Sequence, residues 1–128
     1  MDRKITKSLI AWKNSPNRKP LVLFGARQVG KTYSLLAFGK ENYREVVYFN
    51  FENNPRLWEI FADDLDTNRI ITALGALAGK NITKGETLII FDEIQAEPKA
   101  VTSLKYFCED NPEYHIVAAG SLLGVATN

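Results

Sequence analysis

Four short apolar runs, separated by segments with helical spacing, set the strongest constraint on how this 128-residue chain can fold. The runs lie at residues 21–24, 46–51, 87–91 and 114–119, and they are rich in branched or aromatic side chains. Helical patterns occupy residues 31–39, 55–61, 66–79 and 98–110. Because every connection is too long for a hairpin, the strands are expected to be parallel with helical crossovers. The sequence therefore predicts a layered α/β fold.

A short helix is predicted before the first strand. Apolar residues at Ile5, Leu9 and Trp12 recur with helical spacing among basic residues, and Pro16 ends the pattern. We therefore expect residues 1–17 to form a leading helix and linker, and residues 18–128 to form the core.

The composition excludes several classes of protein. A net charge of +1 offers no overall electrostatic attraction to nucleic acid or to an anionic membrane. The single cysteine, Cys108, and the single histidine, His115, exclude an intrachain disulfide framework and a Cys- or His-based zinc cluster, and both are expected to be structural. No apolar run reaches the roughly 20 residues of a membrane helix, and the N-terminus lacks the apolar stretch of a signal peptide. A cytoplasmic protein with no membrane partner is the expectation.

The segment GARQVGKT at residues 25–32 fits the pattern G-x-x-x-x-G-K-[ST] in full, between the first strand and the next helix. Glycines let the backbone N–H groups of such a loop close around a phosphate, and the helix N-terminus adds its positive dipole end. Lys31 is expected to reach the β- and γ-phosphate oxygens and the Thr32 hydroxyl to ligate Mg²⁺. The predicted nucleotide-binding residues are Gly25, Gln28, Val29, Gly30, Lys31, Thr32 and Tyr33.

A pair of acids ends the third apolar run. Asp92 and Glu93 follow Leu88-Ile89-Ile90-Phe91, about 60 residues after the phosphate loop, which is the Walker B pattern. Asp92 is expected to hold Mg²⁺ directly or through water, and Glu93 to polarise the attacking water as a general base. The Asp-x-x-Gly and Asn-Lys-x-Asp motifs of a GTPase do not occur in the sequence, so ATP is favoured over GTP.

Other polar residues at strand ends are weaker candidates. Ser121 follows the fourth run and would face the γ-phosphate if that strand lies between the first and the third, although a turn serine is an equally good interpretation. Asn50 and Glu52 end the second run and are candidates to position water.

Three kinds of function are compatible with these residues. The first is an ATPase core with Lys31, Glu93 and Ser121 as its catalytic residues. The second, a small-molecule kinase, needs an arginine-rich lid that the sequence does not show. The third is an interaction module in which nucleotide controls binding of DNA or a protein without significant hydrolysis.

Three segments together resemble a large prokaryotic family of AAA-type ATPases with a nuclease-like C-terminal region. They are LVLFGARQVGKT at residues 21–32, IIFDEIQ at 89–95 and AAGSLLG at 118–124. The resemblance implies a three-layer P-loop NTPase fold with sheet order 5-1-4-3-2, Mg-ATP as the ligand, and Ser121 at the position of a polar sensor.

Members of that family continue beyond the fourth strand. The resemblance therefore implies that this chain is an N-terminal fragment, truncated after strand 4 and lacking strand 5. The expected partners are ATP and ADP, the C-terminal region of the full-length chain, and further copies of the fragment through an exposed first strand. A DNA or protein partner stays open, and so does ATP hydrolysis by the fragment alone.

Overall fold

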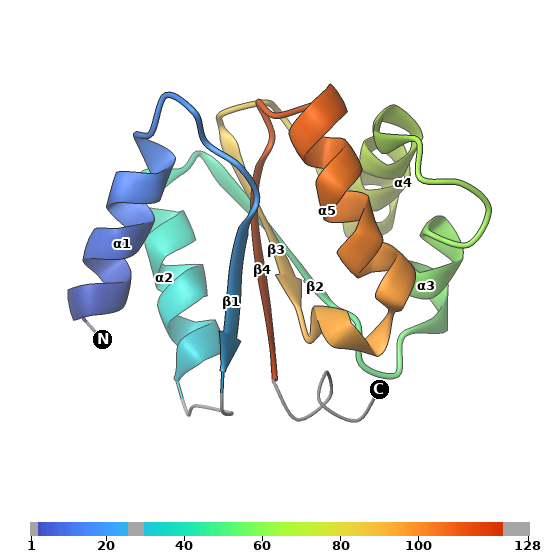
Figure 1. Cartoon of the computed structure of the whole chain (residues 1–128), viewed down its shortest axis with the longest axis horizontal. Coiled ribbons are helices and arrows are strands. Elements are labelled where there is room, and N and C mark those ends of the chain that lie inside the picture. Colours follow the sequence, from blue (N-terminus) through green and yellow to red (C-terminus); the bar gives the residue numbers. More distant parts are fainter. Residues whose placement is uncertain (1–2, 26–29, 122–128) are drawn as a thin grey trace.

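The structure is a computed structural model that describes residues 3–25 and 30–121. Figure 1 shows a central sheet covered by helices on both faces. One face is covered by α1 (Arg3–Lys13) and α2 (Lys31–Asn42). The other is covered by α3 (Pro55–Ile60), α4 (Thr67–Ala78) and α5 (Pro98–Asp110). The predicted three-layer α/β fold with a leading helix is confirmed.

The sheet holds four parallel strands in the order β1-β4-β3-β2. They are β1 (Leu21–Gly25), β2 (Glu45–Asn50), β3 (Thr87–Asp92) and β4 (His115–Ser121). This is the order predicted for the first four strands of a P-loop NTPase. In the register, Gly25 lies opposite Ser121 and Asn50 lies opposite Asp92. All four strands therefore end at the same edge of the sheet.

Side chains alternate between two hydrophobic cores on either side of β3, every residue of which is buried. Ile89 and Phe91 pack toward α3, α4 and α5, whereas Leu88 and Ile90 pack toward α1 and α2. Each such side chain contributes roughly 1.5–3 kcal/mol when fully buried. A continuous apolar run therefore forms a strand here because helices cover both of its faces.

The helix ends follow local sequence signals. Asp66 caps α4 by accepting the N–H groups of Asn68 and Arg69, and the helix ends at Gly79. α3 and α5 both begin with proline, which suits a first helical position that needs no N–H donor. α2 runs to Asn42, three residues beyond its predicted end, and the Asn42 side-chain amide donates to the Phe38 carbonyl at 2.9 Å.

Two apolar residues on helices that were expected to pack inward are less buried than their helical patterns predict. Leu77 in α4 is 39% exposed, and Cys108 in α5 is only partly buried. A helical pattern gives the direction of a side chain but not the extent of the surface that covers it. His115, predicted to be structural, is buried at the start of β4 beside Tyr43. Within the described residues, no helix is long and apolar enough to cross a membrane.

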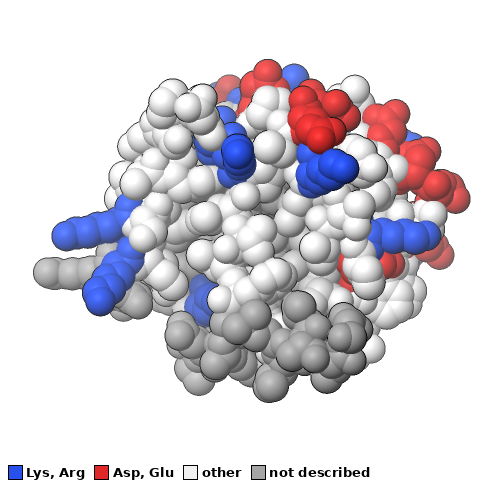
Figure 2. All heavy atoms as spheres, in the orientation of Figure 1, with Lys and Arg blue, Asp and Glu red and all other residues white. Residues whose placement is uncertain are grey.

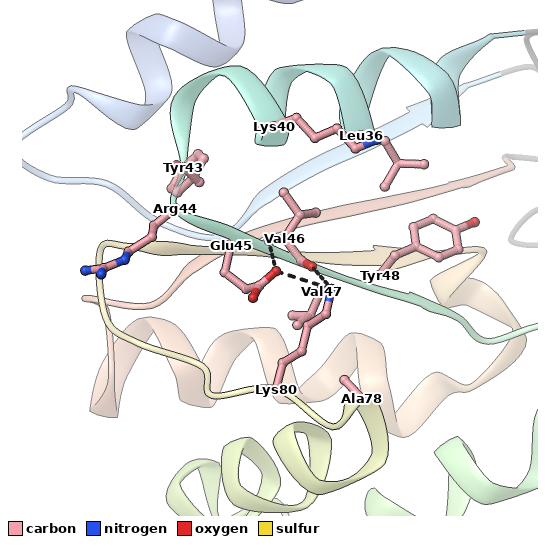
Figure 3. Close-up of a pocket in the computed structure, with 10 residues that line it drawn as sticks. All are labelled: Leu36, Lys40, Tyr43, Arg44, Glu45, Val46, Val47, Tyr48, Ala78 and Lys80. Atoms are coloured by element: carbon pink, nitrogen blue, oxygen red, sulfur yellow. Dashed lines mark hydrogen bonds and ion pairs between the residues drawn. The ribbon is translucent and has the colours of Figure 1, made fainter.

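The outer edge of β2 carries a groove of about 500 Å³, shown in Figure 3. Lys80 reaches across it, with Nζ 3.2 Å from the Glu45 carboxylate and donating to the Val46 carbonyl at 3.3 Å. A lysine on an unpaired edge hinders pairing with another strand. Lys31 and Asp92 are not among the described residues that line the groove, whereas Tyr48 is.

Charged side chains are spread over the face shown in Figure 2. On the part of that face that the structure describes, two basic side chains lie together on the side of α1 and the others are scattered, and acidic side chains gather toward α4 and α5. This distribution agrees with the net charge of +1 and forms no continuous basic surface on the described part of this face.

Candidate nucleotide-binding site

The carboxyl ends of the strands bring the predicted site residues to one edge of the sheet. β1 leads toward α2, β3 ends at Asp92, and β4 ends at Ser121. In Figure 1 the ends of β1 and β4 lie together at the bottom of the molecule, near the start of α2. Open parallel sheets bind their ligands at this kind of edge.

The first turn of α2 contacts the end of β3 directly. The Thr32 hydroxyl donates a hydrogen bond to Oδ2 of Asp92 at 2.8 Å, from 60 residues away in the sequence. Asp92 is only 4% exposed, so its carboxylate depends on such partners. Its other oxygen, Oδ1, accepts the backbone N–H of Glu93 at 3.0 Å. The threonine of the predicted phosphate loop and the aspartate of the predicted acidic pair therefore form one site.

Tyr48, which the sequence patterns did not indicate, is a further donor to Asp92. Its hydroxyl donates to Oδ2 at 2.5 Å. Burial, followed by the hydrogen bond to Asp92 and the charge of Asp92, raises the pKa of Tyr48 well above its usual value, so the phenol keeps its proton. In Figure 3 its ring points away from Lys80. The contact with Asp92 follows from the pairing of β2 with β3, because Asn50 lies opposite Asp92 and Tyr48, two residues earlier, shares the face of Asn50.

Glu93 adopts a left-handed backbone conformation, with φ 52° and ψ 44°. This conformation is uncommon for a residue with a side chain, and strained residues cluster at functional sites. Glu93 begins the turn into the short helix η1 (Ile94–Ala96). Its carboxylate oxygen Oε2 accepts a hydrogen bond from Gln95 Nε2 at 3.2 Å, and the residue is partly exposed. The position gives a carboxylate that water can reach.

Lys31 opens α2 directly after Gly30, whose φ of 92° lies in the left-handed region that favours glycine. The Lys31 ammonium donates to the Gly120 carbonyl at 3.3 Å, so it reaches the end of β4. Its charge adds to the positive end of the helix dipole. This corner of the molecule is therefore suited to an anion.

Ser121, the predicted sensor, is 8% exposed at the end of β4. Its backbone N–H donates to Oε1 of Gln95 at 3.3 Å. Gln95 therefore lies between β4 and Glu93. The sequence showed it only as part of the segment that carried the family resemblance.

A family profile described as the AAA domain matches residues 17–128. The chain belongs to the AAA domain family. Among solved structures it is similar to the Aeropyrum pernix Orc1 protein in complex with DNA, with a TM-score of 0.54 and 16% sequence identity. The similarity covers 97% of this chain and 38% of the Orc1 chain, and at this identity it shows the fold alone. No curated protein matches the chain significantly in sequence.

Membership of the AAA domain family supports an ATP-binding module of the P-loop type. The structure brings five of the predicted residues to one edge of the sheet: Lys31, Thr32, Asp92, Glu93 and Ser121. Gly25 and Gly30 stand at the two ends of the loop, whereas Gln28 and Val29 lie outside the described residues. Tyr33 is 71% exposed on α2. Asn50 accepts the Glu52 N–H at 2.9 Å, so its side chain shapes the turn after β2.

The oxygen donors of the AAA domain fit a magnesium ion. Mg²⁺ prefers hard oxygen ligands and usually takes one or two from the protein, with the rest from phosphates and water. The Thr32 hydroxyl and the Asp92 carboxylate already lie 2.8 Å apart. Within residues 3–25 and 30–121, no group of three or more His, Cys, Asp or Glu could hold a metal. The donor set suits a metal that arrives with a nucleotide.

Proposed function

We propose that this AAA domain binds Mg-ATP at the carboxyl edge of its sheet and, in the full-length protein, hydrolyses the terminal phosphoanhydride bond. The observation that carries the proposal is the 2.8 Å contact between Thr32 and Asp92, because it joins two predicted half-sites that are 60 residues apart. Lys31 and Glu93 are the chain neighbours of these two residues. The family profile supports ATP binding, and the proposal of hydrolysis depends on Glu93.

Lys31 and the Thr32–Asp92 pair are proposed to bind the nucleotide. Lys31 would exchange the Gly120 carbonyl, a neutral partner at 3.3 Å, for negatively charged phosphate oxygens. Thr32 and Asp92 would hold Mg²⁺, which when bound supplies positive charge to the phosphate oxygens. The N-terminal N–H groups of α2 add further donors for phosphate.

Glu93 is proposed as the general base. It accepts a proton from the water whose oxygen attacks the γ-phosphorus, while the bond from that phosphorus to the β–γ bridging oxygen breaks. The electron pair of the broken bond leaves with ADP, and the new P–O bond forms inorganic phosphate. Ser121, at the end of β4, is proposed to detect this change.

Nucleotide binding is tested by a thermal melt with and without millimolar Mg-ATP. A ligand present at about 100 times its dissociation constant adds roughly 2.7 kcal/mol to stability, so the midpoint should rise by several degrees. Lys31→Ala should abolish the rise, whereas Lys40→Ala, near the other end of the same helix, should retain it. GTP should give a smaller rise. A melt unaffected by ATP would contradict the proposal.

Hydrolysis is tested by phosphate release from the full-length protein. Glu93→Gln should keep the ATP-dependent rise in melting temperature but lose phosphate release by about 100-fold or more. Glu109→Gln, an exposed glutamate on α5, is the matched control and should release phosphate normally. If Glu93→Gln leaves the full-length protein unchanged, the domain is a nucleotide-dependent interaction module without significant hydrolysis.

The ATP and ADP states are proposed to switch a C-terminal region of the full-length chain, as the family resemblance implies. A DNA partner is the alternative, because the similar Orc1 structure is a complex with DNA. The net charge of +1 gives no overall attraction to DNA and favours the first interpretation. Fluorescence anisotropy of labelled duplex DNA with the full-length protein, with ATP and with ADP, distinguishes them.

A further inference from the structure

A single peptide group at the end of β4 contacts both halves of the candidate site. Its carbonyl, which belongs to Gly120, accepts a hydrogen bond from Lys31 Nζ at 3.3 Å. Its N–H, which belongs to Ser121, donates to Gln95 Oε1 at 3.3 Å. Because the carbonyl and N–H of one peptide unit are conjugated, a donor on the oxygen makes the N–H a stronger donor. This peptide group therefore links α2 to the turn after β3.

Gln95 extends the link to Glu93. Its Nε2 donates to Oε2 of Glu93 at 3.2 Å, while its Oε1 accepts from Ser121. A primary amide can accept at one end and donate at the other, whereas a carboxylate only accepts and an ammonium only donates. The residue type at 95 therefore suits a position between an N–H group and a carboxylate.

The close approach of Gln95 to β4 requires a glycine at position 120. A Cβ there would overlap Oε1 of Gln95 and come within 2.6 Å of Cε1 of Phe24. Glu93, with its left-handed backbone, begins the η1 turn that carries Gln95. Two unusual local features, a glycine at a strand end and a left-handed glutamate, therefore both support the same contact.

We infer that Gln95 is a positioning residue that couples the orientation of the Glu93 carboxylate to the engagement of Lys31. While Lys31 donates to the Gly120 carbonyl, Gln95 Nε2 donates to the Glu93 carboxylate. When Lys31 moves to the phosphates of a nucleotide, the 120–121 peptide loses that donor, and the Glu93 carboxylate, still bonded to Gln95 Nε2, shifts with the Gln95 amide to the position from which it accepts the proton of the attacking water. This inference rests on the proposed function, because it takes Glu93 as the general base.

The coupling is tested first without nucleotide, by backbone amide NMR. Gln95→Met should move the Ser121 amide proton upfield and speed its exchange about 10-fold, because its acceptor is lost. Lys31→Met should move the same proton upfield by a smaller amount. Lys40→Met, on the same helix but far from β4, is the matched control and should leave it in place. An unchanged Ser121 amide in either of the first two variants overturns the inference.

ATP hydrolysis by the full-length protein then tests whether Gln95 positions the Glu93 carboxylate. Gln95→Met should lower kcat about 10- to 100-fold and leave KM within about 2-fold, because a misplaced base costs turnover rather than binding. Gln95→Glu keeps the acceptor and the length but loses the donor, so it should lower kcat while the Ser121 amide stays bonded. If Gln95→Met no longer melts cooperatively, Gln95→Glu takes its place in the kcat measurement.

Two results separate this inference from the proposed function. A wild-type kcat in both Gln95 variants overturns the positioning role while the proposed function stands. A wild-type protein that neither binds nor hydrolyses ATP refutes the proposed function, and the Ser121 amide shifts alone then decide whether Lys31 and Gln95 are coupled.

Discussion

The single histidine should make the stability of this domain depend on pH between 7 and 5. His115 is 5% exposed, and its Nδ1 lies 2.6 Å from the Tyr43 hydroxyl. Burial raises the pKa of Tyr43, so the phenol stays protonated and donates to the neutral imidazole. Burial, followed by the charges of Arg18 and Lys13, lowers the pKa of His115 from 6.5 to about 4. The folded state therefore resists protonation at this position.

The sign of the effect follows from proton binding in the two states. The unfolded chain protonates His115 near pH 6.5, and the folded chain does so only near pH 4. Between these values the unfolded state binds more protons, so stability falls as the pH falls. Between pH 7 and pH 5 the loss amounts to about 2 kcal/mol of unfolding free energy. Most carboxylates remain ionised at pH 5, so the histidine contribution is separable from theirs.

Urea unfolding at the two pH values measures this loss. The wild type should lose about 2 kcal/mol more between pH 7 and pH 5 than His115→Gln, which has no titrating group at this position. The variant is expected to be less stable at pH 7, but the comparison uses only the change with pH. Equal losses in the two proteins would show that His115 does not titrate differently in the folded and unfolded states, and would refute the reasoning.

Three further predictions concern stability without nucleotide. Tyr48→Phe removes a donor to Asp92 and should lower the unfolding free energy by about 1–2 kcal/mol in urea, whereas the exposed Tyr33→Phe should match wild type. Gly120→Ala should cost about 1–3 kcal/mol, because its Cβ meets Phe24 and Gln95, and a wild-type thermal melt would contradict that packing. Phe91→Ala, in the fully buried β3, should cost about 3–5 kcal/mol in urea, and a loss under about 1 kcal/mol would be inconsistent with its burial.

The layers were predictable because their signals are local. Every residue of β3 is buried, so its unbroken apolar run has a direct structural cause. Parallel pairing followed from connection lengths, and the order of the strands followed from the family resemblance. The exposure of Leu77 was not predictable, because the helical pattern gives the direction of a side chain but not the extent of the surface it meets.

The residues of the candidate site also fall into a group that the sequence predicted and a group that it did not. Lys31, Thr32, Asp92 and Glu93 were predicted because each belongs to a contiguous motif. Tyr48 and Gln95 were not, because their roles depend on contacts with residues 44 and 26 positions away. The Tyr48 contact depends on the β2–β3 register, and the Gln95 contact depends on how closely η1 approaches β4. Neither quantity is encoded in a short segment of sequence.

The partners of Asp92 explain how a buried carboxylate can be stable in this fold and still be suited to binding a cation. Its oxygens accept hydrogen bonds from two hydroxyls, those of Thr32 and Tyr48, and from the Glu93 N–H. These donors satisfy the carboxylate, which forms no ion pair with any residue in 3–25 or 30–121. An arginine in their place would hold Asp92 more strongly and compete with any cation for it. Because the two hydroxyls are neutral and can rotate away, the Asp92 oxygens can exchange these donors for a cation.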